Sequence, residues 1–316
     1  MSLPILILSI FTFVELNCEN LFDCQHDTLK HDTEFLPDGA YHWTHTRYWQ
    51  KLNRVGQTVI ACGDSDDGSE WRLPDMVALC EVENDSVMRD LTQRSLLRNA
   101  RYEYVMTASP DERGIDVALM YSPFSFRLIG SHAVRVPTVK GMRPTRDILY
   151  ASGVVASGDT LHVIVAHLPS KRGGELLSRP YRRAAARRVC EVVDSVRAVS
   201  GAARIILAGD FNDNSDSETV QMMVRCGMAD LSRNAVGRNG AKGTYRYHGE
   251  WSNIDHVLVS LPMERMAVGC HVHDAEFLLQ PDEKYGGVKP RRNYIGPRYL
   301  NGFSDHLPLV AKFSME

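Results

Sequence analysis

The stretch Arg204-Ile-Ile-Leu-Ala-Gly-Asp-Phe-Asn212 joins a short apolar run to a polar end. The apolar run predicts a buried strand, and the polar residues follow at the point where that strand ends. Because Asp210 and Asn212 are two residues apart, their side chains point to the same side beyond the sheet edge. A carboxylate there can take a proton from water, and the amide can donate to an anionic oxygen. Alternatively, the stretch is only a strand followed by an Asx turn.

Other apolar strands of the chain also end in polar residues suited to chemistry. Their ends carry Asn17 and Asn20, Glu81, His167, Asp255, and Asp305 with His306. One carboxylate at a strand end is usually just solvated, but so many in one chain favour a shared site. A site that draws on residues from Asn17 to His306 leaves no room for a domain boundary. We therefore expect one domain over residues 1–316.

The composition is that of an ordinary globular protein. The chain has 316 residues, of which 44% are apolar and 24% charged, enough to bury a substantial core. Its formal net charge is −3, whereas proteins that bind long nucleic acids usually have a basic balance. We therefore expect no strong nucleic-acid footprint. The seven cysteines include no Cys-x-x-Cys pair, which argues against a zinc site or a disulfide framework.

The N-terminal segment leaves the compartment open. Residues 3–13 are apolar, but no Lys or Arg precedes them and no small-residue cleavage site follows. Residues 1–10 could be the remnant of an export signal or a segment next to a tag. No segment is long and apolar enough to predict a membrane span. We expect a soluble monomer, either cytoplasmic or exported.

The order of predicted elements favours two packed sheets. Apolar runs predict strands at 12–16, 75–80, 102–106, 115–121, 148–156, 161–166, 204–208, 254–260 and 307–313. Helical patterns cover 46–62, with Thr46 as N-cap, 84–97 and 174–199. Many strands with few intervening helices predict an α/β protein with two sheets and helices outside them. Residues 63–72 predict a surface loop, and the long stretch 280–302 predicts a functional loop.

Two motifs identify a family resemblance. Leu207-Ala-Gly-Asp-Phe-Asn212 and Ser304-Asp-His-Leu-Pro308, in this order and with Asn17 and Glu81 upstream, resemble the endonuclease/exonuclease/phosphatase superfamily. This superfamily comprises deoxyribonuclease I-like, metal-dependent phosphoesterases. The resemblance covers nearly the whole chain. It implies a four-layer sandwich of two mixed β-sheets flanked by helices, with the site at one end of the sheets.

The resemblance also implies a metal. A phosphoester is anionic, so a cation must neutralise it, and Mg²⁺ prefers one or two carboxylates together with waters and phosphate oxygens. Glu81 is the best candidate ligand for Mg²⁺ or Mn²⁺, with Asp305 and Asn17 beside it. Glu83 is interpreted as a solvated charge.

The remaining site residues receive roles by the same resemblance. Asp210 would orient and deprotonate the attacking water, and Asn212 would hold a non-bridging oxygen. His306 would contact the phosphoryl group with Asp255 behind it. His167 would stabilise the transition state or protonate the leaving oxygen. Asp116 is predicted as the partner of His167, although a charge at the start of a strand explains it equally well.

Four residues are predicted to bind substrate. Arg146 matches a phosphate-contacting Arg of some relatives, but it could equally be a surface strand residue. Arg291 and Arg292, in the long loop before Asp305, are better placed to hold a phosphate or a headgroup. Asn20 completes the set.

The leading function is metal-dependent hydrolysis of a phosphodiester or phosphomonoester by in-line attack of an activated water. One alternative is an endonuclease or exonuclease that binds DNA or RNA weakly. Another is a lipid headgroup hydrolase of the sphingomyelinase or inositol phosphatase type, although His256 stands where the inositol 5-phosphatases have Arg. Outside enzymes, a non-catalytic binding protein on the same fold is the rival. The motifs are common to the superfamily, so they leave the substrate open.

Overall fold

The computed structural model describes residues 9–63 and 71–315, which form two mixed sheets of six strands each. The first sheet has the strand order β13 (Ala267–Val272), β18 (Leu309–Met315), β1 (Ser9–Leu21), β2 (Met76–Val82), β4 (Asp116–Tyr121) and β3 (Glu103–Met106). The second has the order β5 (Phe126–Val134), β6 (Ile148–Val155), β7 (Thr160–Val165), β8 (Arg204–Asp210), β12 (Asp255–Ser260) and β9 (Met228–Asp230). The pairs β1·β2 and β7·β8 are parallel.

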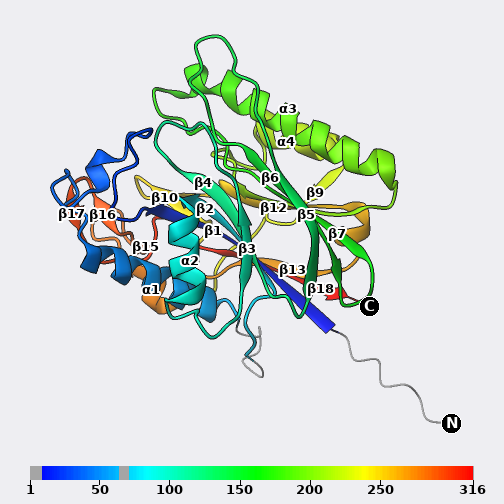
Figure 1. Ribbon diagram of the computed structural model, residues 1–316, viewed down its shortest axis with the longest axis horizontal. Coiled ribbons are helices and arrows are strands. Elements are labelled where there is room, and N and C mark those ends of the chain that lie inside the picture. The colour runs from blue at the N-terminus through cyan, green and yellow to red at the C-terminus, as the bar shows by residue number, and fades with distance from the viewer. Residues whose placement is uncertain (1–8, 64–70, 316) are drawn as a thin grey trace.

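Helices cover the outer face of each sheet. The helices are α1 (His45–Ala61), α2 (Asp85–Gln93), α3 (Glu175–Val199), α4 (Glu218–Arg225) and the single turn α5 (Leu261–Glu264). Figure 1 shows α3 and α4 together on one side of the molecule, and α1 with α2 on the other. In the described part of the chain, no helix is long and apolar enough to cross a membrane.

Three apolar clusters fill the three interfaces between these four layers. Strand β1 shows how the period of two distributes them: Phe11 and Phe13 pack between the two sheets, whereas Val14 and Leu16 pack outward against α1 and α2. The third cluster lies between α3, α4 and the second sheet. The expected four-layer sandwich is confirmed.

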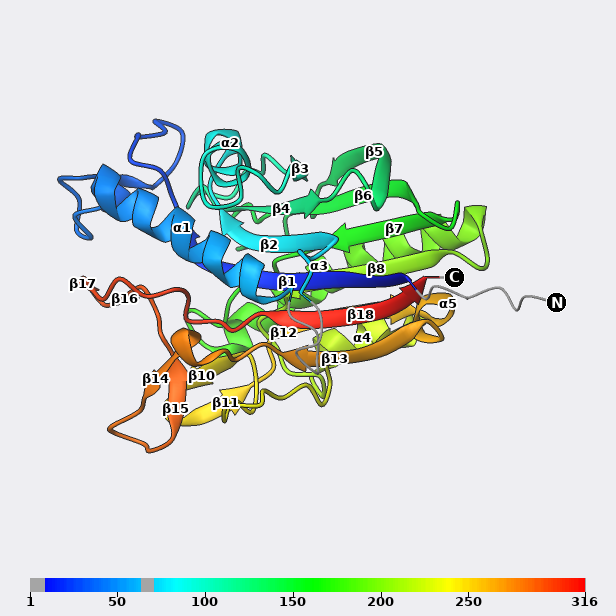
Figure 2. The same ribbon diagram turned by 90° about the horizontal axis from the view of Figure 1, so that it is seen from below.

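Three small hairpins and two 3₁₀ turns complete the structure. The hairpins are β10 (Tyr245–Tyr247) with β11 (Glu250–Ser252), β14 (Leu279–Pro281) with β15 (Val288–Pro290), and β16 (Tyr294–Ile295) with β17 (Arg298–Tyr299). The turns are Thr33–Phe35 and Glu276–Leu278. Figure 2 shows the hairpins at one end of the sandwich, while β1 begins and β18 ends at the other.

Several boundaries differ from the sequence predictions. The N-cap of α1 is Thr44, not the predicted Thr46. The Thr44 side chain accepts from the Arg47 backbone N–H. Helix α2 ends at Gln93. The stretch 280–302 is not structureless, because most of it forms the β14 to β17 hairpins. Residues 1–8 of the predicted N-terminal segment and 64–70 of the predicted loop lie outside the described residues.

Irregular backbone turns the strand ends toward one another. Glu81 has φ of 63°, and the pairing of β2 shifts register on both sides of it. Glu19 and Asn20 at the end of β1 also have positive φ, at 51° and 57°. Such bulges redirect a side chain that strict alternation would send to the other face of the sheet. Left-handed backbone at non-glycine residues is uncommon and gathers at functional sites.

Gly209 is required by a close approach of strands β7 and β8. Its φ is 139°, and a Cβ at this position would lie 2.0 Å from the carbonyl oxygen of Ala166. We expect Gly209→Ala to lower the free energy of unfolding by about 2 kcal/mol or more, because strain and overlap add. Thermal denaturation measures this. Gly201→Ala is the control, since nothing lies within 4 Å of its Cβ; equal melting temperatures for the two variants would contradict the assignment.

Candidate active site

Polar side chains from both sheets meet where β8 ends and β12 begins. Asp210 and Asp255 are register partners on these antiparallel strands. From the facing sheet, Asn17 Nδ2 donates to Asp210 Oδ2 over 3.0 Å. His306, just before β18, donates from Nδ1 to the two Asp255 oxygens at 2.8 and 3.0 Å. The structure therefore brings together four residues that lie far apart in the sequence.

The Gly-Asp-Phe-Asn motif is both a turn and part of this site. The Asn212 backbone N–H donates to Asp210 Oδ1 over 2.8 Å, which is the Asx turn of the alternative interpretation. Between them, the Phe211 ring points the other way and stacks on His256 with centroids 5.1 Å apart. Asn212 Nδ2 donates to the carbonyl of Leu168 over 3.0 Å. An amide has two N–H donors, so a second one is available for a ligand.

The charges in this cluster shift one another's pKa values. Burial and then the charge of Asp255 raise the pKa of Asp210 to about 7, although His306 opposes them. Burial lowers the pKa of His306, but the carboxylates of Asp255, Asp305 and Asp210 outweigh it and hold this pKa well above its ordinary value. His306 is therefore a cation at neutral pH. Asp210 titrates near the pH at which a general base works best.

His167 lies beside Asp210 but not beside its predicted partner. Its Nε2 is 3.5 Å from Asp210 Oδ2, while Nδ1 has no hydrogen-bond partner among the described residues. The Asp116 carboxylate instead accepts from the Thr107 hydroxyl and the Ser109 backbone N–H. The predicted pairing is not formed, because Asp116 starts β4 and is used to fix the adjoining loop. Burial, then Arg146 and Arg113, lower the pKa of His167 well below its ordinary value, so it is neutral.

Arg146 is buried and holds the backbone of the His167 segment. Its guanidinium donates to the carbonyls of His167 and Leu168 at 3.3 and 2.8 Å and to Asp111 at 3.3 Å. Arg146 is therefore not a surface strand residue. It also lines a pocket of about 330 Å³, and its contact with a substrate stays a prediction.

Glu81 is held by the end of β1. One oxygen accepts from the Asn20 backbone N–H over 2.9 Å, and the other lies 3.9 Å from Arg113 Nη1. The Asn20 side-chain oxygen accepts from Arg113 Nη2 over 2.6 Å. Asn20 therefore orients Glu81 and Arg113. Arg113 was not predicted as a site residue, since nothing in its local sequence indicates that it reaches two strand ends.

Asp305 belongs to a second charged group next to His306. Arg292 Nη2 lies 2.9 Å from one Asp305 oxygen, and His306 Nε2 lies 3.9 Å from the other. Glu19 is buried beside Arg292 at 3.5 Å, and burial, then Asp305, raise its pKa to about 7. Arg291 is separate from this group, because its guanidinium lies over the Phe303 ring.

Three buried titratable residues of the site were not predicted. Glu19 accepts from the backbone N–H groups of Asn293 and Tyr294. Lys51, on the buried face of α1, donates to the Phe303 carbonyl. Among the described residues neither oxygen of Glu15 has a hydrogen-bond partner, and burial followed by Asp255 raises its pKa well above the ordinary value. Two sequence features could have indicated such residues: a Glu on the inward face of β1 and a Lys on an apolar helix face.

The donor set fits a hard divalent cation. Asp210, Asp255 and His306 have potential ligand atoms within 4.8 Å of one another, but His306 is protonated and paired with Asp255, so it has no free nitrogen for a cation. Glu81 and Asp305 add carboxylates nearby. Burial lowers the pKa of Lys51, and both of these carboxylates act against that shift. Oxygen-rich sets of this kind suit Mg²⁺ or Mn²⁺ and lack the thiolates that favour softer metals.

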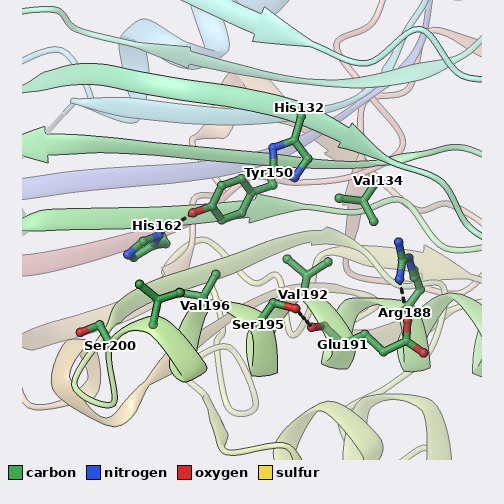
Figure 3. A pocket seen from close by; sticks show the side chains of 11 residues that line it. His132, Val134, Tyr150, His162, Arg188, Glu191, Val192, Ser195, Val196 and Ser200 are labelled. Carbon is green, nitrogen blue, oxygen red and sulfur yellow. Dashed lines mark hydrogen bonds and ion pairs between the residues drawn. The ribbon is translucent and has the colours of Figure 1, made fainter.

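A pocket of about 350 Å³ lies away from this site, between β5 to β7 and the C-terminal half of α3. Figure 3 shows Tyr150 between His132 and His162, with the Tyr150 hydroxyl 2.7 Å from His162 Nδ1. Burial lowers the pKa of His162. This pocket contains none of the carboxylates of the site, so the chemistry does not lie there.

Two facing mixed sheets with a carboxylate and histidine cluster at one end are the architecture of the deoxyribonuclease I-like phosphoesterases. A model of the Endonuclease/Exonuclease/phosphatase family matches residues 12–315. The chain belongs to this family, as its motifs indicated. No curated protein matches the sequence.

Solved structures agree on the fold. A mannosyl-6-phosphatase of Bacteroides thetaiotaomicron is 16% identical, with a TM-score of 0.60 over 95% of this chain and 98% of that one. A truncated TDP2 of Caenorhabditis elegans is 15% identical, with a TM-score of 0.56 over 97% and 98%. A protein of unknown function from Enterococcus faecalis is 17% identical, with a TM-score of 0.60 over 97% and 100%. At such identities the likeness establishes the fold alone.

The Asp255 carboxylate keeps His306 charged and oriented. We expect Asp255→Asn to lower kcat for a generic phosphodiester by about 10²–10⁴-fold. The same change lowers the pKa of His306, which an NMR titration of its imidazole measures. Asp230→Asn is the matched control, because Asp230 lies 3.6 Å from His256 outside the site. An unchanged His306 titration in Asp255→Asn would refute the assignment.

Glu83 lies outside the cluster and accepts from the Asp23 backbone N–H over 2.7 Å. Burial raises its pKa to about 8. The unfolded chain loses this proton near pH 4.3 and the folded protein near pH 8, so Glu83 costs stability as the pH rises between these values. We expect Glu83→Gln to melt above the wild type by an amount that grows from pH 5 to pH 8, by about 2 °C or more. The exposed Glu264→Gln serves as control; a pH-independent difference would contradict this.

Proposed function

We propose that the protein is a metal-dependent phosphoesterase that hydrolyses a phosphodiester or phosphomonoester by in-line attack of an activated water. One observation carries the proposal: Asn17, Asp210, Asp255 and His306 converge from two sheets, although all four lie in separate segments of the chain. Family membership supports the same reaction class. The phosphatase named among the similar structures is consistent with it.

Asp210 is the proposed base. Its two oxygens are held by the Asn17 amide and the Asn212 backbone N–H, so the carboxylate is fixed relative to both sheets. A fixed carboxylate with a pKa of about 7 can orient a water and accept its proton at neutral pH. The hydroxide equivalent then attacks phosphorus.

Two donors are proposed to stabilise the charge that develops on the phosphoryl oxygens. His306 is cationic and presents Nε2, because Nδ1 is committed to Asp255. Asn212 supplies its second amide N–H. Donors fixed in a buried site of this kind stabilise a transition state more than they would in water. Neutral His167, beside Asp210, completes the set as a hydrogen-bonding group near the reacting atoms.

Glu81 and Asp305, with Asn17, would hold the cation. Bound Mg²⁺ or Mn²⁺ neutralises the negative phosphoester so that the attacking oxygen is not repelled. Arg113 lies beside Glu81, and Arg292 lies beside Asp305. Without a bound cation, these two arginines would be left to neutralise the phosphoester. A nuclease that acts weakly on DNA or RNA is the second candidate, but the net charge of −3 does not favour tight binding to a long polyanion.

Removal of the base tests the reaction. We expect Asp210→Asn to lower kcat for bis-p-nitrophenyl phosphate by about 10²–10⁴-fold in Mg²⁺ or Mn²⁺. Chelation with EDTA abolishes activity of the wild type, and added Mg²⁺ or Mn²⁺ restores it. The exposed Asp194→Asn on α3 is the matched control and keeps wild-type kcat. Hydrolysis by Asp210→Asn at the wild-type rate, or activity that resists EDTA, would exclude this mechanism.

A further inference from the structure

A second pocket adjoins the site, between the β10–β11 and β14–β15 hairpins. We call it the hairpin pocket; its volume is about 310 Å³. It is lined mainly by Arg246, Tyr247, His248, Asp282, Lys284, Tyr285, Lys289, Arg292 and Asp305. Figure 2 shows the two hairpins together at the site end of the sandwich.

The hairpin pocket is continuous with the site. Arg292 and Asp305 line the pocket and also form the charged pair beside His306. Strand β10 starts at the site as well, because Tyr245 forms a β-bridge with His306 and their rings lie 4.9 Å apart. Two residues along an extended strand span about 7 Å, so Tyr247 lies roughly one ring system away from His306. A phosphoester at His306 would therefore extend its substituent toward Tyr247.

Arg246 fixes the pocket wall before any ligand binds. Its Nε donates to the Gly249 carbonyl over 3.2 Å, and its Nη atoms donate to the carbonyls of Gly286 and Val288 on the other hairpin. The guanidinium is buried over the Trp251 ring and lies 3.6 Å from Asp282. Each of its three nitrogens thus donates to a carbonyl within the protein. A preformed wall binds a ligand with less loss of entropy than a mobile one.

The two hairpins also meet at their tips. His248 and Gly249 form the two-residue turn of β10–β11, and both have positive φ, at 49° and 86°. Positive φ at both central positions is the mark of a type I′ turn. A Cβ on Gly249 would lie 2.8 Å from Tyr285 Cβ, so the tip packs directly on the other hairpin.

Exposed aromatic rings line this pocket. Tyr247 stacks on His248 with centroids 4.0 Å apart and planes 12° apart, and His248 in turn faces Tyr285 at 6.3 Å. Tyr247 is 62% and Tyr285 44% exposed, so parts of both rings are accessible to a ligand. Such rings provide a stacking surface for a planar group, whatever its hydrogen-bonding pattern.

The charge of the lining favours an anion beside that planar group. Asp282 is buried and lies near Arg246 and Lys289, at 3.6 and 3.5 Å, so its charge is matched within the wall. Lys284 is exposed, with its Nζ over the Tyr285 ring at 4.7 Å from the centroid. Lys289 and Arg292 are about one third exposed, at 34% and 38% of the side chain. Cations with this exposure can contact a ligand phosphate.

We propose that the hairpin pocket binds the nucleoside part of a nucleotide-type phosphoester, with the base stacked on Tyr247 and a second phosphate near Lys284 and Lys289. This inference rests on the proposed function, because it assigns the substituent of the phosphoester hydrolysed beside His306. The volume suits one nucleoside, not a duplex. A short or free nucleotide ester therefore fits better than long nucleic acid.

Calorimetric titrations in EDTA test binding without turnover. The probes are thymidine 5′-monophosphate, ribose 5-phosphate, thymidine 3′,5′-bisphosphate and an oligothymidylate. We expect thymidine monophosphate to bind about tenfold more tightly than ribose 5-phosphate, because only the former stacks a base. The bisphosphate binds more tightly again. Binding of the oligothymidylate no tighter than that of the bisphosphate indicates a free nucleotide ester; tighter binding indicates the end of a strand and retains the pocket assignment.

Variants separate the ring from the charge. Tyr247→Ala reduces the tenfold preference for thymidine monophosphate over ribose 5-phosphate to about one, because the base loses its stacking partner. Lys284→Ala lowers about fivefold the ratio of the Kd of thymidine monophosphate to that of the bisphosphate. Phe124→Ala and Arg127→Ala, an exposed ring and an exposed cation at the distant β4–β5 edge, leave both ratios unchanged.

Equal binding of thymidine monophosphate and ribose 5-phosphate by the wild type would overturn the inference. A base preference that survives Tyr247→Ala would overturn it too. These titrations contain no metal and measure no hydrolysis, so they stand apart from the test of the reaction. If Asp210→Asn proves fully active, the proposed reaction is refuted, but the affinity ratios still test the proposed pocket. If the affinity ratios differ from those expected, the pocket proposal is refuted and the proposed reaction is not affected.

Discussion

Hydrogen bonds between the two sheets hold the active end of this protein together. Asn17 reaches Asp210, and His306 reaches Asp255, each from the first sheet to the second. Elsewhere the sheets meet mainly through apolar side chains, whose attraction is non-directional and does not by itself fix one register. A buried carboxylate is costly unless it has a partner, so these two pairs favour one alignment of the sheets. The position of every strand end at the site follows from that alignment.

The sequence carried enough information for the main strands, for three helices and for the residues at the strand ends, because each depends on local periodicity or on a short motif. The edge strand β5 was not predicted, since its residues are largely exposed and lack a clear alternation. Hairpins of two or three residues a side are too short for any periodic pattern. Arg113 and Lys51 were missed for another reason: both act on segments distant in sequence, so only the fold reveals their partners.

Two buried charged residues are engaged by the backbone around the site. Asp116, predicted as the partner of His167, accepts instead from Thr107 and Ser109, and Arg146 donates to the carbonyls of His167 and Leu168. In a buried region every backbone carbonyl and N–H requires a partner, and charged side chains at strand ends often meet that requirement. A sequence motif identifies which residues can do chemistry. It does not say which of them already form hydrogen bonds with the backbone.

The way Arg246 joins the two hairpins has a consequence for how this fold diversifies. Its guanidinium donates to the carbonyl oxygens of Gly249, Gly286 and Val288, and every residue type possesses such an oxygen. The junction therefore depends on backbone shape, and the side chains around it are free to change. Over evolutionary time, Tyr247, Lys284 and Tyr285 can be exchanged while the scaffold and the reacting groups persist. New substrates would then be accommodated by exchanging the side chains of the hairpin pocket while its backbone stays fixed.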